Sequence, residues 1–351
     1  MPVRPILLVT LLAAATAACS TIDPGSDAGS AADSETVVLV THNAFVVEKG
    51  LLAEFERQSG LDVQRTAPGD TGTLVNQLVL TKDAPLGDVV FGVDNSFASR
   101  ALSSGILQPY ESPRAAAGAE RFAVDDTDRL TAIDYGDVCI NVDRGWFEER
   151  GIAEPETLRD LTDPTYEDLL VVTNPATSSP GLAFLLATVD AFGADGWPGY
   201  WADLVANGVR VTDSWSDAYF VDFSGSSGNG PRPIVLSYAS SPPAEVSGLD
   251  DEAPTRALLD TCFRQVEYAG VLAGAENTEG AQQLIDFMLS TRFQESVPRT
   301  MFVYPVDRSA DLPATWARFA PLADQPFHVS PDEIDDNREE WIRQWTDVVV
   351  G

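Results

Sequence analysis

The chain has 351 residues, 44% of them hydrophobic, which is enough for a two-lobed globular body. Its 54 acidic and 22 basic residues give a formal net charge of −32 at pH 7. Nucleic acid is therefore not an expected partner, because its phosphates would be repelled. Only two histidines occur, without a G-x-S-x-G, H-E-x-x-H, P-loop or G-x-G-x-x-G pattern, so most hydrolase and metalloenzyme designs lack support and we expect no metal or cofactor.

The N-terminal part is interpreted as a targeting segment followed by a tether. An apolar and small run at residues 5–18 is too short to span a bilayer and is typical of a secretory signal. The ending "TAAC" resembles a bacterial lipobox, which predicts a signal peptide over residues 1–19 and lipidation of Cys19. Because Thr16 stands where that motif usually has Leu, simple cleavage stays open. Residues 20–35 predict a flexible tether, and we expect an extracytoplasmic protein, lipid-anchored to the outer face of the cell membrane or periplasmic.

From residue 36 onward, short β-branched runs alternate with helical patterns. Strands are predicted at residues 37–41, 62–67 and 88–93, and helices at 47–58, 71–82 and 95–105. An alternation of strand and helix predicts a parallel α/β sheet.

A second series of the same kind follows the strand "CINV". Strands are predicted at residues 169–173, 209–212 and 233–238, and helices from Pro180, around 197–208, from Ser214, at 278–290 and at 330–349. We expect Ser179 to cap the helix that starts at Pro180, and Gly193 to end that helix. Ser330 with Glu333 predicts a capping box.

The two series predict an α/β fold of two lobes. The approximate bounds are residues 36–133 plus 262–351 for lobe 1 with the C-terminal helices, and 134–261 for lobe 2. Polar and aromatic clusters follow several predicted strands, where ligands bind in open α/β sheets. These clusters supply His42, Asp94, Asp134 and Tyr135 as candidate ligand contacts, although the last two alternatively serve the crossing between the lobes. One cleft between two such lobes predicts binding by closure.

Seven segments in chain order carry a resemblance to a known family. They are "FGVDNS", "IDYG", "NPATSSPGL", "DSWSDAY", "LSYASSP", "MFVYPV" and "REEWIRQW". From about Val37 to its end, the chain resembles the thiamine-binding periplasmic proteins of ABC importers. The resemblance implies the two-lobed type II solute-binding fold, which iron-binding and polyamine-binding proteins share. It also implies a monomeric receptor that delivers thiamine or its phosphates to a membrane permease and is not an enzyme.

The resemblance also assigns ligand contacts. Trp215 and Tyr238 match the family's cleft aromatics, whose π-faces suit a cationic thiazolium. Asp70, Ser178 and Ser179 match its polar contacts, which suit a hydroxyl or a phosphate at a helix start. From the residues alone, Trp215 and Tyr238 are alternatively core side chains.

The chain departs from the family at three aromatic positions. His42 and Ala244 stand where tyrosines are usual, and Lys49 stands where a tryptophan is usual. Fewer aromatic side chains would then surround the ligand. Three alternatives stay open: the chain binds a modified vitamin, binds a pyrimidine fragment of the vitamin, or binds with weaker affinity. Two rival functions also stay open, namely a polyamine receptor of the same fold and a secreted hydrolase with paired carboxylates.

The cysteines beyond Cys19 form one candidate pair. Cys139 and Cys262 would lie in an oxidising compartment, where a disulfide is expected, and two buried thiols are the alternative.

Overall fold

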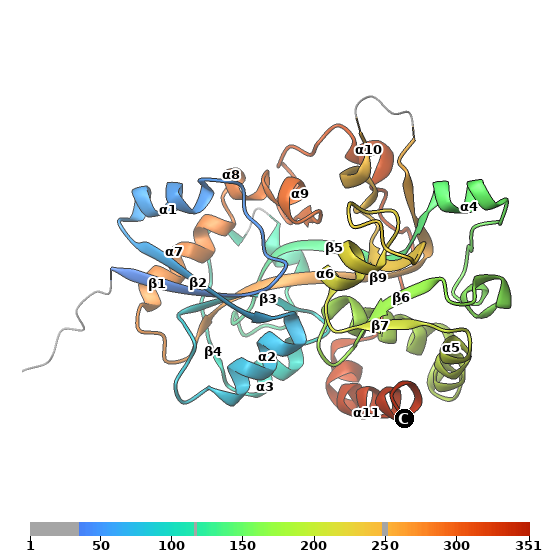
Figure 1. The fold of residues 1–351 in the computed structure, drawn as a ribbon. Helices are drawn as coiled ribbons and strands as arrows, with labels where there is room; N and C mark the ends of the chain where they lie inside the picture. Colours follow the sequence, from blue (N-terminus) through green and yellow to red (C-terminus); the bar gives the residue numbers. More distant parts are fainter. Residues whose placement is uncertain (1–34, 116–117, 248–251) are drawn as a thin grey trace, which may run out of the picture. The chain divides into compact units, whose positions relative to one another are not determined.

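The structure is a computed structural model that describes residues 35–115, 118–247 and 252–351 (Figure 1). The chain from Ser34 onward forms one compact unit. The predicted signal peptide, the tether up to residue 34 and the lipidation of Cys19 lie outside the described residues.

The strands form one mixed sheet in the order β2-β1-β3-β9-β5-β8-β6-β7, with β4 paired to β9 and β10 to β5. Their bounds are β1 (Thr36–His42), β2 (Asp62–Gly69), β3 (Val89–Asp94), β4 (Leu107–Gln108), β5 (Thr131–Asp143), β6 (Leu170–Thr173), β7 (Arg210–Thr212), β8 (Ile234–Tyr238), β9 (Thr255–Leu272) and β10 (Tyr304–Pro305). β1 is parallel to β2 and β3, and β6 is parallel to β7 and β8. The long antiparallel strands β5 and β9 join these two parallel regions (Figure 1). The α/β prediction is thus confirmed.

Helices pack on this sheet. They are α1 (Leu51–Ser59), α2 (Thr71–Leu80), α3 (Ala98–Ser103), α4 (Arg144–Arg150), α5 (Ser179–Ala206), α6 (Trp215–Asp217), α7 (Thr278–Met288), α8 (Thr291–Gln294), α9 (Val297–Thr300), α10 (Trp316–Phe319) and α11 (Pro331–Val349). Short 3₁₀ helices occupy Ala119–Phe122, Asp160–Thr162, Pro164–Tyr166 and Pro242–Glu245. None of the helices within the described ranges is both long and apolar enough to cross a membrane.

The C-terminal helix α11 packs against both α5 and α3. Ser330 caps it as predicted, because the Ser330 hydroxyl accepts a hydrogen bond from the Glu333 N–H at 3.3 Å. Ile334, Trp341 and Trp345 form its buried face, at the spacing of an amphipathic helix. α11 therefore holds helices from the early and the middle parts of the chain together.

The start of α5 differs from the expectation. Ser178 precedes the helix without a side-chain capping bond and Ser179 is its first residue, so the prediction that Ser179 is the cap is wrong. Both hydroxyls are buried, Ser178 beside the Asp70 carboxylate and Ser179 beside the Asp94 carboxylate, and neither satisfies hydrogen-bond geometry within the described residues. Gly193 has non-helical backbone angles (φ 69°, ψ 172°) and separates two helical segments within α5, so the first segment ends at this glycine as expected.

Two other helix starts are set by local chemistry. The helix predicted from residue 47 begins only at Leu51, after Gly50 in the left-handed region (φ 87°). The helix predicted from Ser214 is only the short α6, followed by a π-helical turn at Ala218–Asp222. The Ser214 hydroxyl accepts from the Asp217 N–H at 3.2 Å, which fixes the orientation of Trp215 at the first helical position.

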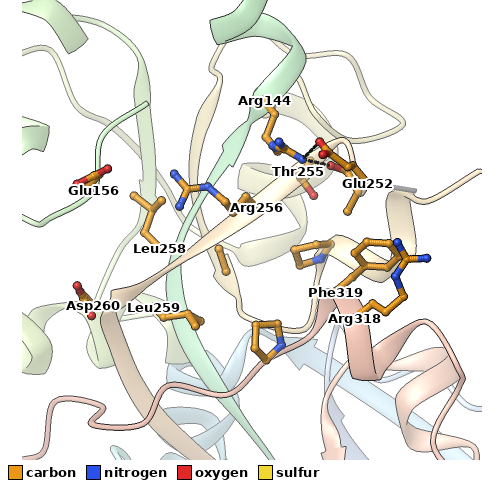
Figure 2. Close-up of a pocket in the computed structure, with 14 residues that line it drawn as sticks. Arg144, Glu156, Glu252, Thr255, Arg256, Leu258, Leu259, Asp260, Arg318 and Phe319 are labelled. Atoms are coloured by element: carbon orange, nitrogen blue, oxygen red, sulfur yellow. Dashed lines mark hydrogen bonds and ion pairs between the residues drawn. The ribbon is translucent and has the colours of Figure 1, made fainter. Parts of the chain in front are cut away.

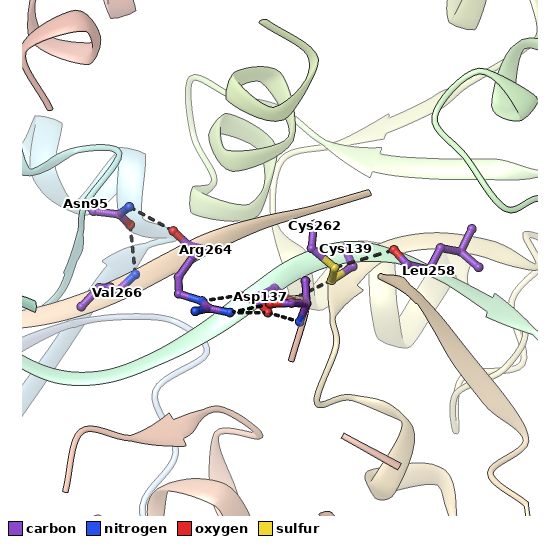
Figure 3. A network of polar contacts seen from close by, with 8 residues as sticks. Asn95, Asp137, Cys139, Leu258, Cys262, Arg264 and Val266 are labelled. Carbon is purple, nitrogen blue, oxygen red and sulfur yellow. Dashed lines mark hydrogen bonds and ion pairs between the residues drawn. A yellow bond between two sulfur atoms is a disulfide. The ribbon is translucent and has the colours of Figure 1, made fainter. Parts of the chain in front are cut away.

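A disulfide and a half-buried ion pair link strands β5 and β9 (Figure 3). Cys139 and Cys262 form the disulfide, with their Cα atoms 4.2 Å apart. The fully buried Asp137 carboxylate accepts hydrogen bonds from Arg264 at 2.7 and 2.9 Å and from the Ala323 N–H at 2.7 Å. The two strands that join the halves of the sheet thus act as one element.

The loop after β3 is fastened to β9 in the same region (Figure 3). The Asn95 side chain donates to the Arg264 carbonyl at 3.1 Å and accepts from the Val266 N–H at 3.0 Å. This bridge fixes the end of β3 beside the middle of β9.

Candidate functional site

One pocket of about 190 Å³ collects five of the nine predicted ligand contacts. The five are His42, Asp70, Ser179, Trp215 and Tyr238. They stand at the end of β1, at the start of α2, at the start of α5, in α6 and at the end of β8. Strand ends and helix starts thus supply the site, as expected for an open α/β sheet. We call this hollow the central pocket.

Contacts between distant segments hold the elements around the central pocket together. The Trp215 N–H donates to the Asp70 carboxylate at 3.1 Å, and the Gly72 N–H donates to the Thr177 carbonyl at 2.9 Å. A Cβ atom at Gly72 would lie 2.5 Å from the Ala176 carbonyl oxygen. Only glycine permits this approach, so α2 meets the segments before α5 and α6 at backbone distance.

Aromatic side chains form one wall of the central pocket. This aromatic wall consists of Trp215, Phe220 and Tyr238, whose rings lie 5.4 Å (Trp215 to Phe220) and 6.2 Å (Trp215 to Tyr238) apart. The Trp215 indole N–H donates to the Ser237 hydroxyl at 3.0 Å, and the Tyr219 ring stacks on the Trp215 ring at 5.1 Å. Trp215 is therefore held in one orientation, with both its polar and its apolar parts satisfied.

Acidic and imidazole side chains also line the central pocket, next to the aromatic wall. His42 Nε2 lies 3.2 Å from Glu267 Oε1, and Asp70 faces the same imidazole. Burial alone would lower the pKa of His42, but the carboxylates of Glu267, Asp70 and Asp94 together raise it above its ordinary value. Burial raises the pKa of Asp70, partly offset by His42 and by the N–H groups of Trp215 and Thr71.

Four predicted contacts do not line the central pocket. Ser178, Asp94 and Asp134 are buried next to it, each with 0% exposure. Each lies beside a lining residue, namely Asp70, His42 and Glu267 respectively. Tyr135 lies elsewhere: its ring packs on Phe122 at 4.7 Å and on Tyr304 at 5.6 Å. Because neighbours on a strand point to opposite faces, only one of the two residues in "DY" can face the pocket.

The lining residues that sequence reasoning missed include Glu267, Phe220 and Phe302. Glu267 stands among apolar neighbours in β9, but in a chain with 54 acidic residues one more acid gives little signal. Phe302 has a left-handed backbone (φ 57°), which is rare for an aromatic residue and is found at functional sites. Phe220 is 42% exposed, an unusual value for a phenylalanine.

A second hollow adjoins the central pocket and shares three of its aromatic residues, Trp215, Phe220 and Phe302. Its volume is about 230 Å³, and Ala244 and Glu245 are among its other lining residues. The small side chain at residue 244, where the resembled family has a tyrosine, thus borders space next to the aromatic wall. Lys49, the third departure, is exposed and is not part of either lining.

A wider hollow of about 610 Å³ lies around the first half of β9 (Figure 2). Two of its arginines are paired with acids, Arg144 with Glu252 at 2.8 Å and Arg256 with Glu154 at 2.6 Å. None of the predicted ligand contacts lines it. In the described parts of the chain, no group of three or more His, Cys, Asp or Glu residues is arranged to hold a metal ion. The central pocket is therefore the candidate binding site.

Curated relatives match most of this chain. The thiamine-binding periplasmic protein of Escherichia coli (strain K12) is 27% identical over 321 residues, covering 88% of this chain and 92% of the relative. The thiamine-binding periplasmic protein of Brucella suis biovar 1 (strain 1330) is 26% identical over 323 residues, covering 89% of this chain and 91% of the relative.

Solved structures and a family model agree on the fold. A periplasmic thiamin binding protein matches with a TM-score of 0.78 at 25% identity, covering 90% of this chain and 96% of that chain. The periplasmic binding protein AfuA from Actinobacillus pleuropneumoniae matches with a TM-score of 0.76 at 19% identity, covering 90% and 98%. The expected type II fold is thus confirmed. Residues 84–325 match the family described as bacterial extracellular solute-binding protein, and the chain belongs to that family.

Proposed function

We propose that this chain is the extracytoplasmic receptor of an ABC importer and that it binds thiamine in the central pocket. The proposal depends on one observation, namely that an aromatic wall and buried acidic groups line the same pocket. A permanently cationic thiazolium gains from both, because π-faces and carboxylates attract positive charge most strongly where water is excluded. The relatives named thiamine-binding periplasmic proteins, which match along most of their length, support the same ligand.

Each part of the lining takes a role in this proposal. Trp215 and Tyr238 contact the thiazolium ring, while Asp70 and Glu267 balance its charge. The Ser179 hydroxyl, at the start of α5, borders the pocket and is available to the hydroxyethyl group.

We expect free thiamine to bind better than its phosphates. A helix start favours anions, but here Asp70 and Asp94 already face the start of α5 through Ser178 and Ser179. A phosphate would meet these carboxylates at short range, and like charges repel strongly in a buried site.

The remaining roles follow from a receptor function. The protein delivers thiamine to a membrane permease, acts as a monomer, is tethered through lipid on Cys19 and catalyses no reaction. A polyamine is a poorer fit, because Asp70 and Glu267 both face His42 and so gather at one end of the central pocket. A flexible dication needs carboxylates at both ends.

Calorimetry with thiamine, thiamine monophosphate and spermidine tests the proposal. We expect one thiamine per chain, weaker binding of the monophosphate and no measurable heat with spermidine. Spermidine binding without thiamine binding would replace thiamine by a polyamine as the ligand. Recovery of chemically altered thiamine after incubation would favour the hydrolase alternative.

A further inference from the structure

Three buried acidic residues form a line across three neighbouring strands. Asp94 on β3 and Asp134 on β5 both lie directly opposite Glu267 on β9. Residues that are directly opposite point to the same face of a sheet, and like charges in such positions are destabilising. The exposed fractions are 0%, 0% and 6% for Asp94, Asp134 and Glu267. We call these three residues the acidic row. Because the row lowers the stability of the sheet, its presence indicates a function.

Glu267 is the member of the acidic row that lines the central pocket. His42 reaches it at 3.2 Å because the imidazole lies over Gly92, where a Cβ atom would be 2.1 Å from the ring carbon Cδ2. The Gly92 backbone is left-handed as well (φ 99°). Glycine at this position thus allows β1 to present an imidazole to β9 across β3.

The other two members carry carboxylate oxygens without a donor. Asp94 Oδ1 accepts from the Ser96 N–H and hydroxyl and from the Phe97 N–H, at 2.7 to 3.0 Å. Within the described residues, no N–H or hydroxyl group satisfies the geometry of a hydrogen bond to Asp94 Oδ2 or to either oxygen of Asp134. Glu267 is the partner of Asp134, and two carboxyl groups bond to each other only through a shared proton.

The neighbouring charges determine which of the two carboxyl groups, Asp134 or Glu267, holds that proton. Burial and the neighbouring Glu267 raise the pKa of Asp134 well above its ordinary value. Burial opposes ionisation of Glu267 as well, but the adjacent His42 lowers its pKa overall. Glu267 therefore carries the negative charge and Asp134 holds the proton. Burial also raises the pKa of Asp94 to about 6.

Other charged or titratable groups face the row from each packed element. They are His42 from β1, Tyr238 from β8 and, facing Asp94, Tyr268 from β9 and Arg338 from α11; Asp70, before α2, lies beside His42 and Tyr238.

We propose that Glu267 contacts the ligand and selects for positive charge, and that Asp94 and Asp134 are positioning residues that act through Glu267. The inference rests on the proposed function, because it places the thiamine cation beside Glu267. A cation at this point favours the ionised forms of the row, so binding releases protons at mildly acidic pH. Affinity for thiamine is therefore higher at pH 7.5 than at pH 5.0.

The first experiment measures thiamine and its uncharged oxidation product thiochrome by calorimetry at pH 5.0 and 7.5, in buffers of different ionisation enthalpy. For the wild type we expect at least a tenfold tighter Kd for thiamine at pH 7.5, proton release at pH 5.0, and no such pH effect for thiochrome. Glu267→Gln loses the preference for thiamine over thiochrome. Asp134→Asn and Asp94→Asn keep the preference but reduce the pH effect and the proton release.

The matched control is Asp286→Asn. Asp286 accepts hydrogen bonds from Tyr110 and Ser112, away from the pocket lining, so this variant keeps the pH effect of the wild type. Equal thiamine affinity at both pH values in the wild type, or an unchanged preference in Glu267→Gln, overturns the inference and leaves the thiamine function standing.

The second experiment needs no ligand. The chain has only two histidines, so His328→Gln assigns the His42 imidazole signal in an NMR titration. We expect His42 to titrate above its ordinary range and its pKa to fall in Glu267→Gln. An ordinary His42 pKa that is insensitive to Glu267→Gln overturns the inference. If spermidine binds with the expected pH effect and thiamine does not bind, the thiamine function fails while the charge selection by Glu267 stands.

Discussion

Trp215 is the residue on which the ligand contact depends most directly. Its ring is fixed by the bond to Ser237 and by stacking on Tyr219, so it presents a rigid face to the central pocket. A cation on such a face contributes on the order of 1 kcal/mol or more once water is excluded. The aromatic wall thus supplies a preorganised surface at little entropic cost.

Trp215→Ala should therefore lose the quenching of tryptophan emission by thiamine and raise Kd by about tenfold or more. Trp215→Phe, which keeps an aromatic face, should lose less affinity. Fluorescence titration measures both effects. Trp146→Phe is the matched control, because Trp146 packs on Phe147 and Arg150 in α4 and should keep the quench. Full quenching in Trp215→Ala would contradict the assigned contact.

Ionisation of Asp94 in the acidic row lowers the stability of the folded protein. Its pKa is about 6 in the folded protein against 3.8 for the free side chain, so the folded state binds more protons between these values. Stability therefore falls as pH rises through this window. Asp94→Asn cannot ionise, and its Oδ1 still accepts from Ser96 and Phe97.

We expect Asp94→Asn to raise the free energy of unfolding at pH 7 by on the order of 2 kcal/mol, and to give no such gain at pH 3.5. Urea unfolding at the two pH values measures the difference. An equal effect at both would show that ionisation of Asp94 is not the cause.

At the scale of elements, the paired strands β5 and β9 carry the connection between the two parallel regions of the sheet. Asp137→Ala would leave the half-buried Arg264 guanidinium without its bidentate partner and the Ala323 N–H without an acceptor. Losing hydrogen bonds to a charged group costs about 1.5–3 kcal/mol. Chemical denaturation measures the loss.

Glu340→Ala is the control for Asp137→Ala. Glu340 also binds an arginine, Arg343, at 2.6 Å, but on the exposed face of α11. Its removal should leave the free energy of unfolding nearly unchanged, because exposed ion pairs contribute little. A loss in Glu340→Ala as large as that in Asp137→Ala would contradict the importance given to burial at the strand pair.

The disulfide in the same strands closes a long loop. Cys139 and Cys262 are 123 residues apart, and on chain-entropy grounds such a link stabilises by about 4 kcal/mol. We expect the double variant Cys139→Ser, Cys262→Ser to lose that amount. Thiol titration of the unreduced, denatured chain that begins at residue 20 should find no free cysteine, and two free thiols would rule the bond out.

Local sequence patterns predicted individual strands and helices well, but they did not predict the contacts between those elements. The strands at β1, β3 and β8 and the helix α2 follow from runs of apolar residues a few positions long. The role of Glu267 depends on its register with Asp94 and Asp134, which lie 173 and 133 residues earlier in the chain, and no local pattern reports register. The start of α5 was misplaced by one residue, because Ser178 and Ser179 are both residue types that cap helices and the local pattern does not separate them.

At the scale of the whole molecule, the net charge of −32 surrounds the site with a negative field that attracts a cationic solute. A lipid anchor would hold this receptor near its permease. Cys19→Ala should release the protein from the membrane fraction, because the acceptor of the lipid is lost. Sedimentation with membranes at the level of the wild type would contradict lipidation at Cys19.

A crystal structure of the protein grown with thiamine would show whether the central pocket is the thiamine site. We expect one thiamine there, with its thiazolium against Trp215 and within hydrogen-bond or ion-pair distance of Glu267 or Asp70. Thiamine bound instead in the wide hollow near Arg144, or a central pocket occupied by another solute in the presence of excess thiamine, would contradict this expectation.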